Sequence, residues 1–578
     1  MNSRLGWRWT LFRAAAKPLV ACALSLTLVP TVLSPQAVSA QQLPGPAQPG
    51  IPLVTPPVIP QPSVPPTVVP ETEPLAPPPG AENIRFKLDN VKLQGVTVYT
   101  PDQLKPLYAG LLGKEVPLTE IFKVADAITA KYRTDGYILS RAVVPAQKVE
   151  NGTVTIQVLE GYVDKVTVQG KAPHIVTDYV NRIRGARPLT AKTLERYLLL
   201  ANDIPGVTAR AVLLPSKTTP DAADLLVTVE TKPVSGFGTV DNRGSRYVGP
   251  VQYQAGAGVN SPLGLGEQLQ ARIITTTPTD ELRYGELSLT VPVGPEGTTV
   301  SVTGSKSRSE PGFKLSDLDV QNDTNTLALA VNHPIVRSRA VTLRVGGRFE
   351  YNNLDSDILD TRLSRDRLRV VRVNGALDWV DGLAGVNRLG AEVSQGLNIL
   401  DETETGSDDL SRANGHSDFT KITFSASRLQ RLAANLNLLV AAAGQYAFNP
   451  LLSSEEFGLG GPEFLRAFDP SEQVGDDGLA GRIELQYLFG INRRYLQAIQ
   501  IYGFGDAGEI WNEDAEAGEE DSKALASAGA GLRFNFTDWL SGGIEVAVPL
   551  NGRVAAEDLN DPGSGDDLRV FGNLAATF

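Results

Sequence analysis

Residues 343–351 read LRVGGRFEY, a stretch in which apolar and charged side chains alternate. Successive side chains of a strand point to opposite faces, so one face carries Leu343, Val345, Phe349 and Tyr351 and the other carries Arg344, Arg348 and Glu350. The pattern recurs in IELQYLF (483–489), LRFNF (532–536) and IEVAVPL (544–550). From residue 236 onward it predicts a β-barrel wall with lipid outside and water inside, although a soluble β-sandwich would alternate in the same way.

The lengths of the connections between strands distinguish a barrel from a sandwich. From residue 236, about eight long polar connections alternate with about seven short ones, which predicts about sixteen strands. The long connections include residues 307–323 and 352–367, and the short ones include residues 294–297 and 492–497. An even number of strands places both ends of the barrel on one side with the long loops opposite, as in an outer-membrane β-barrel.

The first 40 residues have the features of a secretory signal peptide. Residues 1–17 carry basic side chains and no acid, Leu19–Leu33 is mostly apolar but too short to span a bilayer, and Val38-Ser39-Ala40 resembles a cleavage site. Cys22, the single cysteine, lies within this segment. A chain cleaved after residue 40 therefore has no cysteine, which suits an oxidising compartment.

Residues 41–82 form a proline-rich linker. Proline at this density prevents helices and sheet hydrogen bonding, so the linker is expected to be extended. One interpretation is a spacer, and the other is a strand-like plug that threads the barrel pore. We favour the spacer.

Two similar small domains are predicted between the linker and the barrel, at residues 83–161 and 162–235. In each, a Pro-Leu-Thr triplet starts a helix, at 117–119 and at 188–190, and Thr119 is the expected N-cap of the first helix. Strands with alternating apolar residues follow in both, so the two segments are interpreted as copies of one β-α-α-β-β unit. Edge strands of such units can pair with an extended peptide. The alternative is that the units are structural spacers.

The composition excludes several classes of function. A net charge of −12 argues against a nucleic-acid-binding face, which needs an excess of basic residues. The three histidines, His174, His333 and His416, are far apart in the sequence, and such isolated histidines are usually structural. The sequence has no zinc-protease, nucleophile-elbow or P-loop motif. We therefore expect no catalytic residue, no metal, no cofactor and no small-molecule substrate.

The segment GGPEFLRAFDP (460–470) holds an arginine among apolar residues in the sixth long connection. Its glycines and apolar side chains predict a loop that folds into the barrel, where Arg466 would need an anionic partner. Asp506, in the motif GFGDAG (503–508), shares one strand face with Phe504, and the glycines of that strand leave room for a loop. The alternative is a solvated Arg466 with Asp506 in a turn. The candidate residues of the loop and the wall are Gly460, Gly461, Arg466, Phe468, Phe504, Asp506 and Gly508.

Nearly all of residues 83–578 resemble the outer-membrane transporters of two-partner secretion, the haemolysin secretion/activation family of proteins with POTRA domains and a barrel. The resemblance is carried by YRTDGYILSRAVVPAQKVENGTVTIQVLEG (132–161), VDNRGSRYVGP (240–250), NSPLGLGEQL (260–269), GGPEFLRAF (460–468) and GFGDAG (503–508).

The resemblance implies a fold and a pair of site residues. The fold is two periplasmic POTRA domains, at 83–161 and 162–235, followed by a sixteen-stranded antiparallel transmembrane barrel at 236–578. In the family, an arginine of the loop inside the barrel meets an aspartate of the wall, and these roles fall on Arg466 and Asp506. Ala467 stands where the family commonly has glycine, which implies a less tightly turned loop tip.

The same resemblance implies export of a large partner protein from the periplasm to the cell surface or medium. The repeats would capture the unfolded cargo, the barrel would be the conduit, and folding outside would supply the drive. An outer-membrane insertase of the same superfamily is the main alternative, and more than two repeats would favour it. A passive porin and a haemolysin-activating enzyme are further alternatives. The repeats argue against the porin, and the absence of a catalytic motif argues against the enzyme.

Overall fold

The structure, a computed structural model, describes residues 45–48, 77–219, 222–515, 520–552, 554 and 568–578. The predicted signal peptide and most of the predicted linker lie outside these residues. Among the helices of the described residues, none combines the length and the apolar character needed to cross a bilayer.

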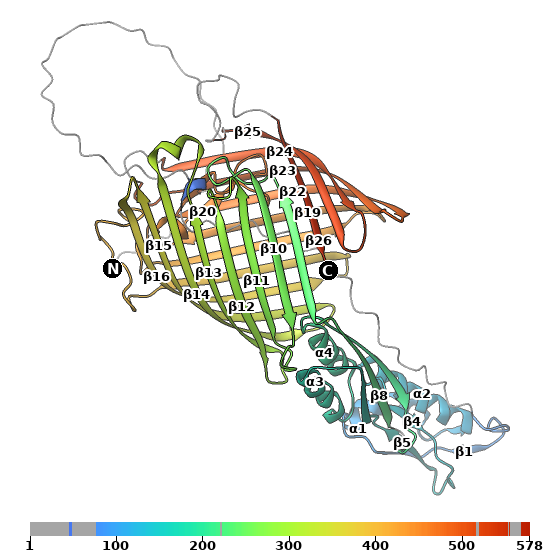
Figure 1. The fold of residues 1–578 in the computed structure, drawn as a ribbon. Helices are drawn as coiled ribbons and strands as arrows, with labels where there is room; N and C mark the ends of the chain where they lie inside the picture. The colour runs from blue at the N-terminus through green and yellow to red at the C-terminus, as the bar shows by residue number, and fades with distance from the viewer. Residues whose placement is uncertain (1–44, 49–76, 220–221, 516–519, 553, 555–567) are drawn as a thin grey trace, which may run out of the picture. The chain divides into compact units, whose positions relative to one another are not determined.

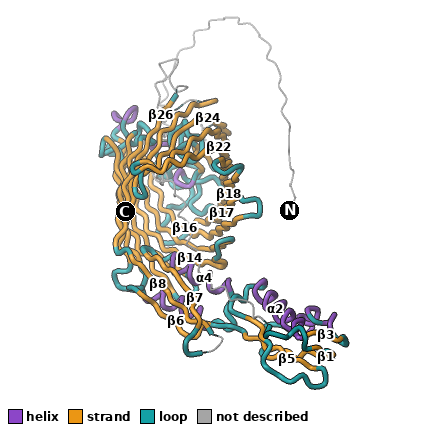
Figure 2. The backbone as a smooth tube through the Cα atoms, turned by 90° about the vertical axis from the view of Figure 1, so that its right-hand side faces the viewer, coloured by secondary structure: helices purple, strands orange, loops and turns teal. Residues whose placement is uncertain are grey.

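The first small unit packs one long helix against a three-stranded sheet. Its elements are β1 (Arg85–Lys87), β2 (Asn90–Gln94), α1 (Pro101–Leu104), η2 (Lys105–Leu107), η3 (Ala109–Leu111), β3 (Glu115–Pro117), α2 (Leu118–Thr134), β4 (Arg141–Val143) and β5 (Thr153–Leu159). The α2 helix lies along the sheet (Figure 2) and buries Ile128 and Tyr132 in a core with Ile156 of β5. The predicted cap at Thr119 is wrong, because the helix already begins at Leu118 and Pro117 is its N-cap.

The second small unit repeats the topology of the first. Its elements are β6 (Val163–Gln169), α3 (His174–Gly185), α4 (Ala191–Asn202), β7 (Val207–Pro215) and β8 (Ala223–Thr231). The sheet orders are β2-β5-β4 and β6-β8-β7, so in both sheets the last strand in chain order is central, parallel to the first strand and antiparallel to the second. In this unit the Pro-Leu-Thr triplet at 188–190 starts a helix, as predicted. The Thr190 side chain caps α4 by accepting a hydrogen bond from the Thr193 amide at 3.1 Å.

Sixteen of the remaining strands close into one antiparallel barrel (Figure 1). Its sixteen strands are β9 (Val234–Asp241), β10 (Val251–Asn260), β11 (Gln268–Thr277), β12 (Arg283–Val293), β13 (Thr298–Ser309), β14 (Val320–Arg337), β15 (Val341–Ile358), β16 (Thr361–Val380), β17 (Gly385–Gly396), β18 (Thr420–Arg431), β19 (Leu436–Ala447), β22 (Asp477–Arg493), β23 (Leu496–Trp511), β24 (Ser522–Asn535), β25 (Leu540–Asn551) and β26 (Arg569–Thr577). Pairing of β26 with β9, from Asn573↔Asp241 to Thr577↔Phe237, closes the ring. The predicted fold class is confirmed.

The alternation in the sequence separates the two faces of the wall. Val345, Leu389 and Phe424 stay exposed on the outer face, as a surface in contact with lipid requires. Glu350 and Arg372 are buried on the inner face and lie 2.7 Å apart. Polar side chains therefore pair with one another inside the barrel.

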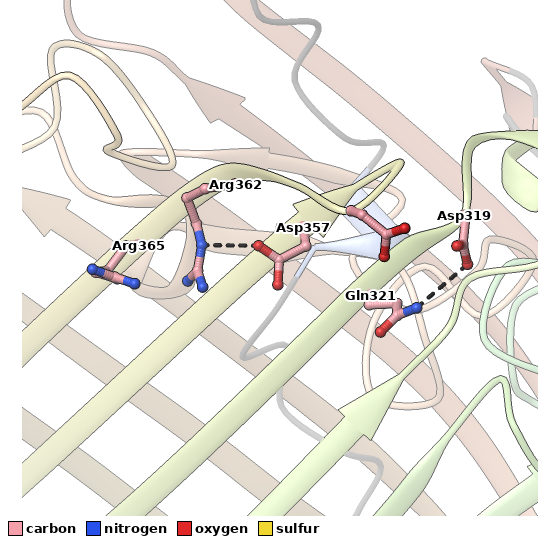
Figure 3. A pocket seen from close by; sticks show the side chains of 6 residues that line it. Asp319, Gln321, Asp357, Arg362 and Arg365 are labelled. Atoms are coloured by element: carbon pink, nitrogen blue, oxygen red, sulfur yellow. Dashed lines mark hydrogen bonds and ion pairs between the residues drawn. The ribbon is translucent and has the colours of Figure 1, made fainter.

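The prediction that residues 352–367 form a long polar connection between two strands is wrong. Strands β15 and β16 continue through this segment and turn only at Leu359 and Asp360, which have φ angles of 48° and 58°. Opposite charges face one another across the hairpin, where Arg362 Nε lies 2.8 Å from Asp357 Oδ1. Figure 3 marks this ion pair with a dashed line. Cross-strand ion pairs stabilise neighbouring strands, so this charged stretch extends the strands and does not form a loop.

The closed ring makes a testable prediction about electrophoretic mobility. Every strand of the barrel has two hydrogen-bonded neighbours, so the fold should resist SDS until it is heated. We expect the unheated protein to migrate faster than the heated protein on an SDS gel. Equal mobilities would contradict a closed barrel.

Candidate functional site

The connection between β19 and β22, residues 448–476, folds back into the barrel, and we call it the lumen loop. It contains three short elements, η5 (Ser453–Glu455), β20 (Phe457–Leu459) and β21 (Gln473–Gly475). The last two pair antiparallel and form a narrow hairpin. At the tip, Leu465, Ala467 and Phe468 are buried in a cluster that includes wall residues of β22–β26.

Two glycines allow the strands of the hairpin to cross closely below its tip. Gly460 and Gly461 have φ angles of 111° and 106°, a region that side chains disfavour. A Cβ atom on Gly460 would lie 2.1 Å from the carbonyl oxygen of Asp469. This close approach therefore requires glycine.

The turn that presents the arginine is tight. The Phe468 amide donates to the Leu465 carbonyl oxygen at 2.9 Å, and Leu465 has a φ of 61°. Ala467 is not among the residues with positive φ, so alanine fits where the family commonly has glycine. The hydrogen bond from Phe468 to Leu465 closes the tip with alanine at position 467.

Arg466 contacts three carboxylates at the end of this turn, and only 2% of its side chain is exposed. Its Nε and Nη2 donate to the two carboxylate oxygens of Asp506, each at 3.0 Å, and its amide donates to Asp506 at 3.1 Å. Nη1 lies 2.6 Å from Glu484 and 3.4 Å from Glu545. The guanidinium lies 3.4 Å from the centroid of the Phe504 ring. The contact is thus bidentate, charge-assisted and reinforced by a cation–π interaction.

The charges of the wall explain why the loop arginine is needed. The three carboxylates come from β22 (Glu484), β23 (Asp506) and β25 (Glu545). Arg533 lies 2.7 Å from Glu484, and Arg243 lies 2.7 Å from Glu545. All three carboxylates are buried, so each needs a cation close by, and Arg466 of the lumen loop contacts all of them.

Close packing on the wall also depends on glycine. A Cβ atom on Gly508 would lie 2.8 Å from Leu459 Cδ2, so this position lets the hairpin approach β23. A Cβ atom on Gly529 would lie 2.5 Å from Phe504 Cζ, so the next strand makes room for the ring beneath the guanidinium. Arg569 of β26 holds the far side of the tip by donating to the Ala467 carbonyl oxygen at 2.7 Å.

The seven candidate residues all lie in the lumen loop or on the wall strand β23 beside it. The structure pairs Arg466 with Asp506, and the burial of Arg466 is incompatible with the solvated alternative. The sequence analysis did not assign Glu484 and Glu545 to the site. The motifs IELQYLF and IEVAVPL put both on the polar face of a strand, but alternation does not show at which height along the barrel they lie.

Part of the proline-rich segment also lies in the lumen. Ala47, in η1 (Gly45–Ala47), is buried with tip residues of the lumen loop, and its carbonyl oxygen accepts from Asn322 of β14 at 3.0 Å. A Cβ atom on Gly45 would lie 2.2 Å from the Ser471 carbonyl oxygen. For residues 45–48 the favoured spacer interpretation is therefore wrong, because they occupy the pore. Residues 49–76 lie outside the described residues.

A sixteen-stranded barrel with an arginine-anchored lumen loop, preceded by two β-α-α-β-β units, defines the class of outer-membrane barrels that carry POTRA domains. Residues 224–534 match the family model "Haemolysin secretion/activation protein ShlB/FhaC/HecB", and residues 86–161 match "POTRA domain, ShlB-type". The chain belongs to this haemolysin secretion/activation family. It is an outer-membrane protein whose N-terminal POTRA domains lie in the periplasm.

Named relatives extend along most of the chain. The heme/hemopexin transporter protein HuxB of Haemophilus influenzae (strain 86-028NP) is 24% identical over 492 residues, covering 82% of this chain and 86% of the relative. The outer membrane transporter CdiB of Dickeya dadantii (strain 3937) is 23% identical over 486 residues, covering 81% and 83%. The solved structure of CdiB from Escherichia coli has the same fold, with a TM-score of 0.72, 22% identity, and 89% and 93% coverage.

Replacing Arg466 by alanine should release the tip of the lumen loop. The change removes the cation that contacts three buried carboxylates, and removing one partner of a buried ion pair costs about 3–5 kcal/mol. We expect chymotrypsin to cut the variant at Phe464 or Phe468 under conditions that leave the parent intact. Arg494→Ala, which removes an exposed arginine from a short turn, is the control and should stay intact. Equal resistance of all three proteins would rule out anchoring by Arg466.

Proposed function

We propose that this protein exports a large partner protein from the periplasm to the cell surface or medium by two-partner secretion. The observation that carries the proposal is the buried contact of Arg466 with Asp506 inside the barrel. A sixteen-stranded barrel is wide enough for an aqueous channel, and a loop held by polar contacts fills that space until a passing chain displaces it. Relatives that are named as transporters support the same conclusion.

Capture of the partner is assigned to the POTRA units at 83–161 and 162–235. In the described part of the chain, β7 pairs only with β8, and β6 pairs with β8 on the other side. The second unit therefore has two edges, of which β7 offers nine residues. An unfolded partner can add to such an edge as an extra strand through main-chain hydrogen bonds.

The partner's own folding outside the cell supplies the drive in this proposal, since the sequence carries no P-loop motif. The protein is a conduit and not an enzyme, and it needs neither nucleic acid nor a small-molecule substrate. Outer-membrane lipid contacts the exposed apolar face of the wall. An insertase of the same superfamily is less well supported, because the family match is to secretion proteins.

Secretion of a partner encoded beside this gene tests the proposal. The partner should accumulate in the medium only when both proteins are produced together. With Arg466→Ala, we expect secretion to fall by roughly tenfold or more, because the loop that organises the conduit has lost its anchor. The variant should still show the faster mobility of an unheated barrel, and Arg494→Ala should secrete normally. Secretion by Arg466→Ala at the parental level would remove the assigned role of the loop.

A further inference from the structure

The base of the lumen loop is held by a second buried ionic cluster. Glu455, in η5, lies 2.7 Å from Arg372 Nη2 through one carboxylate oxygen and 2.7 Å from Lys421 Nζ through the other. Lys421 also donates to the Glu455 carbonyl oxygen at 2.7 Å. All three side chains are buried. One loop carboxylate thus binds two cations of the wall, and we call this group the base anchor.

The wall around the base anchor lacks one negative charge. Its cations come from β16 and β18, and Glu350 of β15 accepts from Arg372 Nε at 2.7 Å. Two wall cations therefore face one wall carboxylate, and Glu455 completes the balance. Arg348, 3.2 Å from Glu350, and Glu392, 4.0 Å from Arg372, lie at the margin of the group and offset each other.

The tip and the base of the lumen loop present opposite charges to two different parts of the wall, through Arg466 and Glu455. At the tip, β22, β23 and β25 present three buried carboxylates, all of which contact Arg466. At the base, β16 and β18 present an excess cation, which Glu455 neutralises. The lumen loop is therefore held by ionic contacts of opposite sign at two parts of the wall.

We propose that Glu455 is a second positioning residue of the lumen loop, and that the conduit opens only when the base anchor and the Arg466 contact are both released. This inference rests on the proposed export function, because the loop must yield to a passing chain. Breaking the Arg466 contact alone leaves the base of the hairpin attached to Arg372 and Lys421. Removing Glu455 from those cations leaves them buried without a counter-ion, which is unfavourable.

A thiol introduced at the base of the loop reports whether the base stays attached. In the full chain, Cys22→Ser removes the single cysteine, and Ser453→Cys places a side chain of similar size at a buried position two residues from Glu455. We expect a membrane-impermeant maleimide to label this reporter thiol about tenfold faster when Glu455→Gln is added, because the carboxylate charge is lost. Glu404→Gln, at an exposed loop glutamate, is the matched control and should leave the rate unchanged.

Charge exchange separates a specific anchor from general damage. Glu455→Lys alone places a third cation in the group and should expose the reporter thiol at least as much as Glu455→Gln does. Adding Lys421→Glu restores an opposite pair and should return labelling toward the parental rate. In planar bilayers, Glu455→Gln combined with Arg466→Ala should raise the conductance beyond the sum of the two single changes. Faster mobility of each unheated variant confirms that its barrel is intact.

Three results would overturn the inference. The first is that Glu455→Gln leaves the labelling rate of the reporter thiol at the parental value. The second is that Glu455→Lys with Lys421→Glu is labelled as fast as Glu455→Lys alone. The third is that Glu455→Gln with Arg466→Ala has the same conductance as Arg466→Ala alone. Each of these leaves the export proposal standing, because labelling and conductance need no partner protein. A parent chain that secretes no partner while the reporter thiol behaves as expected would instead overturn the export proposal and retain the anchor.

Discussion

The ion pair between Arg466 and Asp506 is the interaction on which the packing of the lumen loop inside the barrel depends. The Asp506 carboxylate accepts from Nε and Nη2 of the Arg466 side chain and from the Arg466 amide, and Ser527 Oγ donates to it at 3.4 Å. Without the loop, a buried carboxylate would face its neighbours uncompensated, a state that proteins avoid. Glycine at 460 lets the two sides of the loop approach each other, and glycine at 508 lets the hairpin approach the wall.

The barrel makes such a requirement unavoidable. Alternation turns every second residue of each strand inward, so a wall of sixteen strands lines its lumen with many charged groups. Several of these neutralise one another across neighbouring strands, as Arg372 does with Glu350 and Arg272 does with Glu286. Where such pairing leaves one charge over, a segment from elsewhere in the chain can attach. The lumen loop supplies a counter-charge near each of its ends, through Arg466 and Glu455.

Features that depend only on neighbouring residues, such as strand alternation, could be predicted from the sequence. Features that depend on how distant strands align could not. The alternation in LRVGGRFEY depends only on the period of a strand, and it correctly indicated a wall. The pairing of Arg466 with Asp506 was suggested by residue chemistry and family resemblance together. Residues 352–367 are as polar as a loop, and only pairing across the hairpin makes them strand. Glu484 and Glu545 join the site because three strands align at one height, and sequence shows their face but not their register.

The choice of ionic contacts has a consequence for a channel that must both close and open. Charges that are buried where the lumen loop packs against the wall attract strongly because the local dielectric is low. Water or a polar polypeptide that enters raises the dielectric and offers competing partners, so the attraction weakens when a chain arrives. An apolar plug would behave in the opposite way, since displacing it would expose hydrophobic surface to water. A loop fastened by Arg466 at its tip is therefore firm at rest and releasable by the kind of molecule that must pass.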